Sequence, residues 1–85
     1  MDHQHVQEQL ARLRSELDSA ELTDERREYI RALIADIDMQ LATGQVPDQP
    51  LRDQVEGAVS AFEVEHPRLA GILNNIMITL GNMGI

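Results

Sequence analysis

The sequence predicts an all-α protein of four short amphipathic helices in an antiparallel helical-hairpin or bundle arrangement. Leu, Ala, Glu, Gln, Arg and Ile are abundant, and these residues favour helices, whereas the only aromatic residues are Tyr29 and Phe62. Apolar residues recur at steps of three and four, which is the period of a helix with one buried face. The 85 residues are expected to form a single domain, 1–85.

Two helices are expected in the first half of the chain. The first covers 4–19, and its narrow apolar stripe is Val6, Leu10, Leu13 and Leu17. The second covers 24–43, with Thr23 as its N-cap and Gly44 as its C-terminal stop. Its expected buried face is Tyr29, Ile30, Leu33, Ile34, Ile37 and Leu41. A short connection makes residues 1–43 an antiparallel αα-hairpin.

A loop over 44–49 is expected to lead into a helix pair within 50–85. The two helices are predicted over 50–64 and 67–82. Because Pro67 lacks an N–H group and disfavours helical geometry at the residue before it, we expect one helix to stop and another to begin there. A single kinked helix is the alternative. The expected core face of the third helix is Leu51, Val55, Ala58, Val59 and Phe62.

The chain contains 15 acidic and 7 basic residues, for a net charge of -8, yet no charged residue follows Arg68. On a helical wheel the fourth helix has two faces. The expected core face is Leu69, Ile72, Leu73, Ile76, Met77, Leu80 and Met83, with Ala70 at its edge. The opposite face is Gly71, Asn74, Asn75, Ile78, Thr79, Gly81 and Asn82. This second face is uncharged, which is typical of a contact with a partner chain; a neutral solvent face is the alternative.

We therefore expect an interaction surface on the fourth helix and at the corner before it. Its predicted residues are His66, Pro67, Gly71, Asn74, Asn75, Ile78 and Asn82. A homodimer is the simplest partner, because two-fold symmetry is the commonest closed arrangement and a chain this short has a marginal core. An unidentified protein partner is the other possibility. The predicted role is an accessory module that self-associates.

Several function classes are disfavoured by composition. Nucleic-acid binding needs a basic patch, which this acidic chain lacks. A transmembrane span is disfavoured because Asn and Gly interrupt a short apolar run, and membrane-surface binding has only Arg68 to support it. The sequence has no cysteine, no phosphate-binding loop and no nucleophile–base pair, so we expect no enzyme and no cofactor. A polar N-terminus without a secretory signal indicates the cytoplasm.

Two alternative functions remain open. The segment Met1, Asp2, His3 offers an amine, two amides and an imidazole, a nitrogen set that suits Cu(II) or Ni(II), and His5 lies close by. The competing interpretation of these residues is a disordered polar start. Peripheral membrane association through the fourth helix is the second alternative.

The closing segment FEVEHPRLAGILNNIMITLGNMGI resembles the C-terminal signature of a family of small proteobacterial proteins classified only as a domain of unknown function. The shared pattern is F-E-x-x-H-P-x-L, then L-N, then N-M-G-I. Here these positions are Phe62, Glu63, His66, Pro67, Leu69, Leu73, Asn74, Asn82, Met83, Gly84 and Ile85. The resemblance covers the whole chain but is specific only in its last third. It implies an all-helical fold that ends at Ile85 and brings no activity. Glu65 departs from the small capping residue more usual before His-Pro.

Overall fold

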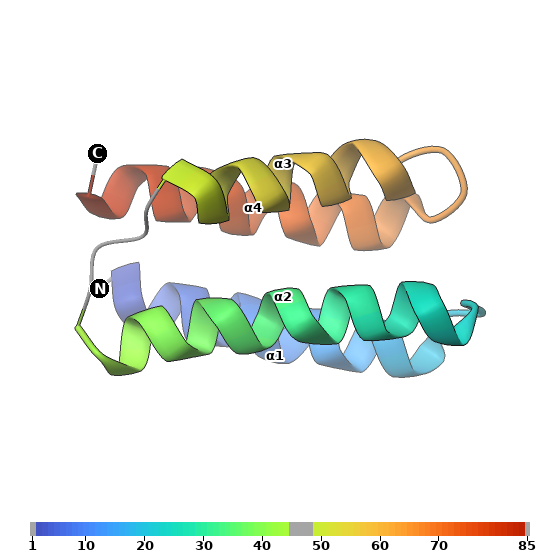
Figure 1. The fold of residues 1–85 in the computed structure, drawn as a ribbon, viewed down its shortest axis with the longest axis horizontal. Helices are drawn as coiled ribbons and strands as arrows, with labels where there is room; N and C mark the ends of the chain where they lie inside the picture. The colour runs from blue at the N-terminus through green and yellow to red at the C-terminus, as the bar shows by residue number, and fades with distance from the viewer. Residues whose placement is uncertain (1, 45–48, 85) are drawn as a thin grey trace.

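A computed structural model describes residues 2–44 and 49–84, and the side chains of residues 4–44 and 49–82. The described residues form four helices: α1 (Asp2–Ser19), α2 (Asp24–Ala42), α3 (Gln49–Phe62) and α4 (Pro67–Gly84). Successive helices run in opposite directions, so α1 starts and α4 ends at the same end of the bundle (Figure 1). The prediction of an all-α bundle of four helices is confirmed, and every helix end lies within two residues of its predicted position.

The ends of α2 follow from the residues that flank it. The Thr23 hydroxyl accepts a hydrogen bond from the Arg26 backbone N–H at 3.2 Å, which satisfies one of the free donors at the helix start. Gly44 adopts a φ of 76°, and its N–H donates to the Leu41 carbonyl at 3.2 Å. Glycine reaches this left-handed region without the Cβ clash of other residues. The predicted cap and stop are therefore confirmed, whereas residues 45–48 of the predicted loop lie outside the described residues.

The break between α3 and α4 is a stop and a restart. α3 ends at Phe62, and the His66 N–H donates to the Phe62 carbonyl at 2.8 Å across the turn. The His66 carbonyl then accepts from the Ala70 N–H at 3.1 Å, which opens the first turn of α4. Pro67 occupies the first helical position, where no N–H is needed. The single kinked helix is excluded.

Arg27 of α2 closes the C-terminal end of α1. Its guanidinium donates to the Leu17 carbonyl at 2.5 Å and to the Ala20 carbonyl at 3.1 Å. Leu17 is in the last turn of α1 and Ala20 follows its last residue, where carbonyls lack a partner within the helix. A cation there also suits the negative end of the helix dipole. This contact joins the two helices of the N-terminal hairpin at their connection.

All four helices contribute to one core. Its buried apolar residues are Val6, Leu10, Leu13, Leu17, Ile30, Leu33, Ile34, Ile37, Leu41, Leu51, Val55, Ala58, Phe62, Leu69, Ala70, Leu73, Ile76 and Leu80. Val59, Ile72 and Met77 were expected in the core and are only partly buried against it. The side chain of Met83 lies outside the described residues.

The placement of Tyr29 in the core was wrong. Tyr29 is 44% exposed, and its ring stacks on Phe62 with centroids 6.4 Å apart and an angle of 17° between the rings. Arg26 covers the Phe62 ring as well, with its Cζ 5.4 Å from the ring centroid. Tyrosine suits such a rim position because its ring can cover an apolar neighbour while its hydroxyl stays in water.

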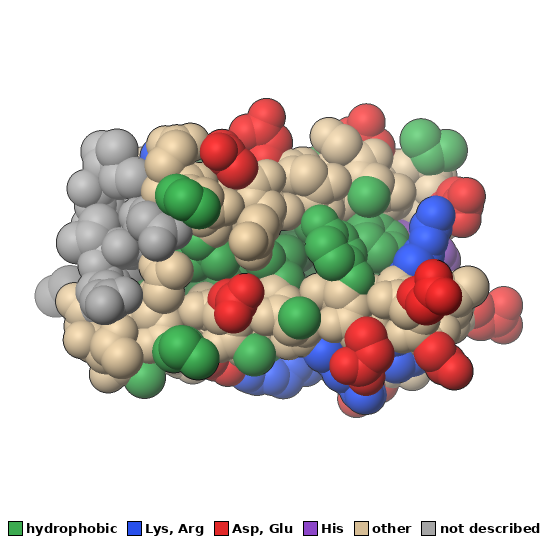
Figure 2. Space-filling view, in the orientation of Figure 1, with side chains coloured by type: hydrophobic (Ala, Val, Ile, Leu, Met, Phe, Trp, Pro, Cys, Tyr) green, Lys and Arg blue, Asp and Glu red, His purple; other side chains and the backbone are tan. Residues whose placement is uncertain are grey.

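The helices are not evenly spaced. α4 approaches α3 and α1 most closely, and α2 lies farther from both of its neighbours. Small buried residues on the two sides of α4, Ala70 and Thr79, allow this close approach. Apolar side chains are visible between α2 and α3, where the helices are farther apart (Figure 2). As a result α4 is enclosed on two sides and presents a single outer face.

Candidate interaction surface

The α4 outer face is the side of this helix that turns away from α1 and α3. It consists of Pro67, Gly71, Asn74, Asn75, Ile78 and Asn82, all exposed except the half-buried Asn74. None of these residues is charged. Arg68, in the first turn, is the only charged residue of α4. The structure therefore places together every residue of the predicted surface except His66.

Ile78 is the largest apolar side chain on this face. It is 52% exposed and lines a groove of about 440 Å³ between α4 and α1. The other residues that line the groove are His5, Glu8, Gln9, Arg12, Asn75, Thr79 and Asn82. The α4 side of the groove is neutral and the α1 side is charged, so the groove separates the uncharged face from an ordinary solvated surface.

Gly71 and Asn74 line a second groove, of about 380 Å³, between α4 and α3. A Cβ built on Gly71 would meet no atom within 4 Å, so packing inside the bundle does not require a glycine there. Glycine in a helix interior costs about 1 kcal/mol relative to alanine. This position therefore lowers helix stability without a structural reason inside the chain.

His66 differs from the rest of the predicted surface. It is half-buried at the corner between α3 and α4, and its ring lies against the Phe62 ring with centroids 6.0 Å apart. Pro67 beside it is exposed. The histidine ring is thus directed toward the edge of the core, and only Pro67 of this pair continues the α4 outer face.

Thr79 does not belong to the outer face, contrary to prediction. It is 7% exposed and faces α1. Its hydroxyl donates to the Asn75 carbonyl at 2.9 Å, one turn earlier in the same helix. Because this bond satisfies the hydroxyl, the short side chain can be buried where α1 and α4 approach closely. Gly81 likewise lies at the α3 interface, where a Cβ would be 3.4 Å from Nη2 of Arg52.

Only one of the candidate metal-binding side chains at the N-terminus, that of His5, lies within the described residues. Met1 and the side chain of His3 lie outside the described residues. His5 is exposed, and its Nε2 is 3.3 Å from the Gln9 side-chain nitrogen. Within the described part of the chain, no group of three His, Cys, Asp or Glu side chains is placed to hold a metal ion. Copper or nickel binding through Met1, His3 and His5 stays a prediction.

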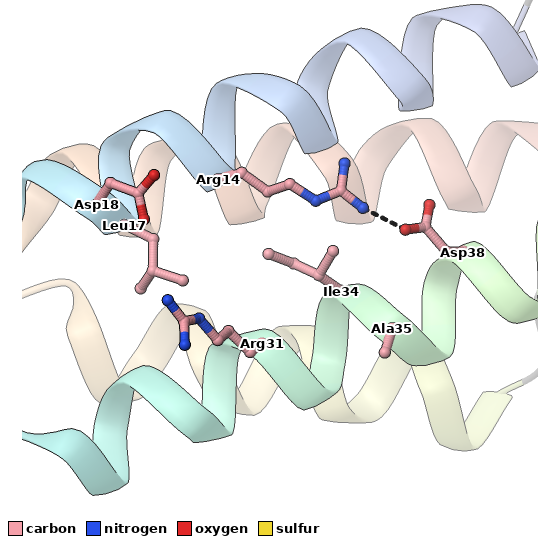
Figure 3. A pocket seen from close by; sticks show the side chains of 7 residues that line it. All are labelled: Arg14, Leu17, Asp18, Arg31, Ile34, Ala35 and Asp38. Carbon is pink, nitrogen blue, oxygen red and sulfur yellow. Dashed lines mark hydrogen bonds and ion pairs between the residues drawn. The ribbon is translucent and has the colours of Figure 1, made fainter.

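A different groove, of about 390 Å³, runs between α1 and α2 (Figure 3). Leu17, Ile34 and Ala35 supply its apolar lining, and Arg14 and Asp38 form an ion pair across it. Both charged side chains remain partly exposed to solvent. The groove therefore has the character of a wide helix–helix seam that an ion pair bridges.

Exposed apolar side chains elsewhere are dispersed. Met39 on α2 is 64% exposed, and Val64 in the α3–α4 turn is 86% exposed. Each is an isolated residue next to acidic neighbours, Asp38 for the first and Glu63 and Glu65 for the second. Single exposed apolar residues are normal on protein surfaces. Ile78 differs because the α4 residues that surround it are uncharged.

A family model described as "Domain of unknown function (DUF4404)" matches residues 6–85. The chain belongs to the DUF4404 family. The match confirms the expected membership of a domain-of-unknown-function family, while the closing signature and the proteobacterial range stay predictions. No curated protein and no solved structure matches the chain.

Sequence reasoning missed the α1 flank of the surface in this DUF4404 domain. His5, Glu8 and Arg12 lie beside Asn75 and Ile78 because α1 packs directly on α4. The apolar stripe of α1 predicts that these residues are exposed, but it does not predict that α4 lies beside them. No helix in the described residues is both long enough and apolar enough to span a bilayer.

Proposed function

We propose that this protein is an interaction module that self-associates through the α4 outer face and acts as an accessory partner by binding, not by catalysis. The observation that carries the proposal is the half-exposed Ile78 among uncharged residues, on a helix without acidic residues, in a chain with a net charge of -8. Loss of charged residues at the centre is the compositional mark of protein–protein interfaces.

The charge of the chain favours a second copy as the partner. Two acidic copies repel each other wherever their charged surfaces meet, and like charges brought together at an interface cost several kcal/mol. The α4 outer face is where this repulsion is smallest, because α4 carries no acidic residue. A basic partner, by contrast, would gain most from the acidic surfaces elsewhere.

Size supports the same proposal. A chain of 85 residues buries a smaller share of its surface on folding than a larger domain does, and small domains are often reinforced by oligomerisation. Disulfides are not available to a chain without cysteine. Covering Ile78 would add apolar burial on the helix that already contacts two neighbours.

The test compares two charge substitutions by sedimentation at high micromolar concentration. Ile78→Asp places a carboxylate at the centre of the α4 outer face, and Met39→Asp places one on α2 at a more exposed apolar residue. We expect the unmodified protein and the Met39 variant to be dimers and the Ile78 variant to be a monomer. Far-UV circular dichroism should show the same helix content for all three.

A monomeric unmodified protein at that concentration would overturn the proposal. So would an Ile78→Asp variant that dimerises as well as the unmodified chain. Loss of the dimer only in the Met39 variant would move the interface to the α2 side and would equally reject the α4 outer face.

A further inference from the structure

The residues of the α4 outer face are arranged symmetrically along the helix. Gly71 and Ile78 lie about two helical turns apart on nearly the same line of the surface. Asn74 and Asn75 lie midway between them, and Pro67 and Asn82 lie at equal distances beyond. Each pair is centred on the same point, between residues 74 and 75.

The members of the two inner pairs are also complementary. Ile78 is a half-exposed branched side chain, whereas Gly71 leaves open space in which a Cβ would meet no atom within 4 Å. An asparagine amide both donates and accepts hydrogen bonds, so it can pair with another asparagine. A two-fold interface requires this kind of reciprocity, because every contact between a residue of one copy and a residue of the other occurs twice.

We propose that two copies join through antiparallel α4 helices, across a two-fold axis that passes between residues 74 and 75. In this arrangement Ile78 of each copy packs over Gly71 of the other, and the asparagines meet at the centre. The inference rests on the proposed self-association and adds its orientation and register.

Arg68 supports the antiparallel orientation. It is exposed in the first turn of α4, where a cation is unfavourable because it lies at the positive end of the helix dipole. It makes no ion pair with the described residues. In the antiparallel arrangement Arg68 lies beside Asn82 of the other copy, near the negative end of that helix, where a cation is favoured. A parallel pair would instead bring the two Arg68 side chains together.

Cysteine cross-linking tests the register, because the natural chain has no cysteine. Asn75→Cys places the two thiols next to the two-fold axis. Asn82→Cys places them about 22 Å apart along the helices, at a rise of 1.5 Å per residue. Since a disulfide needs Cα atoms within about 7 Å, mild oxidation should link the first variant and not the second. Both residues are exposed on the same face, so their chemical access is matched.

Cross-linking of both variants would indicate a parallel pair and overturn the register. Cross-linking of neither, or of Asn82→Cys alone, would also overturn it. In all three cases an unmodified protein that sediments as a dimer would leave the proposed self-association intact. A monomeric unmodified protein would reject both proposals.

Filling the open space at Gly71 provides a second test. Gly71→Leu should weaken dimerisation at least tenfold although Ile78 is untouched, while Gly57→Leu should leave it unchanged. Gly57 is the matched control because it is also exposed, within α3, with no atom within 4 Å of its Cβ position. The double variant Gly71→Ile, Ile78→Gly exchanges the positions of the large side chain and the open space. Its dimer dissociation constant should lie within a few-fold of that of the unmodified protein. The contact between Ile78 of one copy and Gly71 of the other would be rejected if both leucine variants weaken dimerisation equally. It would also be rejected if the double variant dimerises no more tightly than Ile78→Gly alone.

Discussion

Replacing Gly71 by alanine should stabilise the folded monomer and weaken the dimer. The added Cβ meets no atom within 4 Å, so the variant gains the helix preference of alanine over glycine, about 1 kcal/mol, without strain. For a domain of this size, 1 kcal/mol raises the midpoint of thermal unfolding, Tm, by about 4–8 °C. In the proposed dimer the same methyl group occupies space needed by Ile78 of the other copy.

Gly57→Ala separates the two effects. Its Cβ position on α3 is equally open, so the gain in monomer stability should match that of Gly71→Ala. Thermal unfolding followed by circular dichroism should be measured in dilute solution and at high micromolar concentration. Because dimerisation adds stability by mass action, the Tm of a dimer rises with protein concentration. We expect this rise in the unmodified protein and in Gly57→Ala, and a smaller rise in Gly71→Ala.

Two results would refute this reasoning. If Gly71→Ala lowers Tm in dilute solution, the space beside Gly71 is not open and the packing argument is wrong. If both alanine variants and the unmodified protein show the same concentration dependence, the residue has no part in self-association.

Two further predictions concern arginines of the N-terminal hairpin. Arg27→Ala should lower the free energy of unfolding by about 1–3 kcal/mol, because the half-buried guanidinium donates to the Leu17 and Ala20 carbonyls; urea unfolding measures the loss. Arg14→Ala, which breaks the partly exposed ion pair with Asp38, should cost less than about 1 kcal/mol in the same assay. An Arg14 loss as large as the Arg27 loss would contradict this ranking, because the ion pair would then stabilise the hairpin as much as the closure of α1 does.

The helices and most of the core were predictable because their signals are local. Thr23, Gly44 and Pro67 act through their own backbone conformation and hydrogen bonds, and the structure places a helix boundary at each. The spacing of apolar residues likewise depends only on neighbours in sequence, so it identified the buried stripe of every helix. Tyr29 and Thr79, which the sequence misplaced, are amphipathic residues at the edge of a stripe. Their burial depends on which helix lies opposite.

The sequence by itself determined where the helices begin and end to within two residues, which face of each is apolar, and that α4 has a second face of uncharged residues. Only the tertiary structure decided that α4 packs closely against α1 as well as α3, which buries Thr79 and places the charged side of α1 beside Ile78. The reason is physical. Helix formation is governed by contacts within a few residues, whereas the spacing of helices depends on side-chain volumes that meet across the bundle, such as Ala70 and Thr79 on α4. The same packing leaves Gly71 open to solvent, and that open position is the basis for the proposed pairing of two copies.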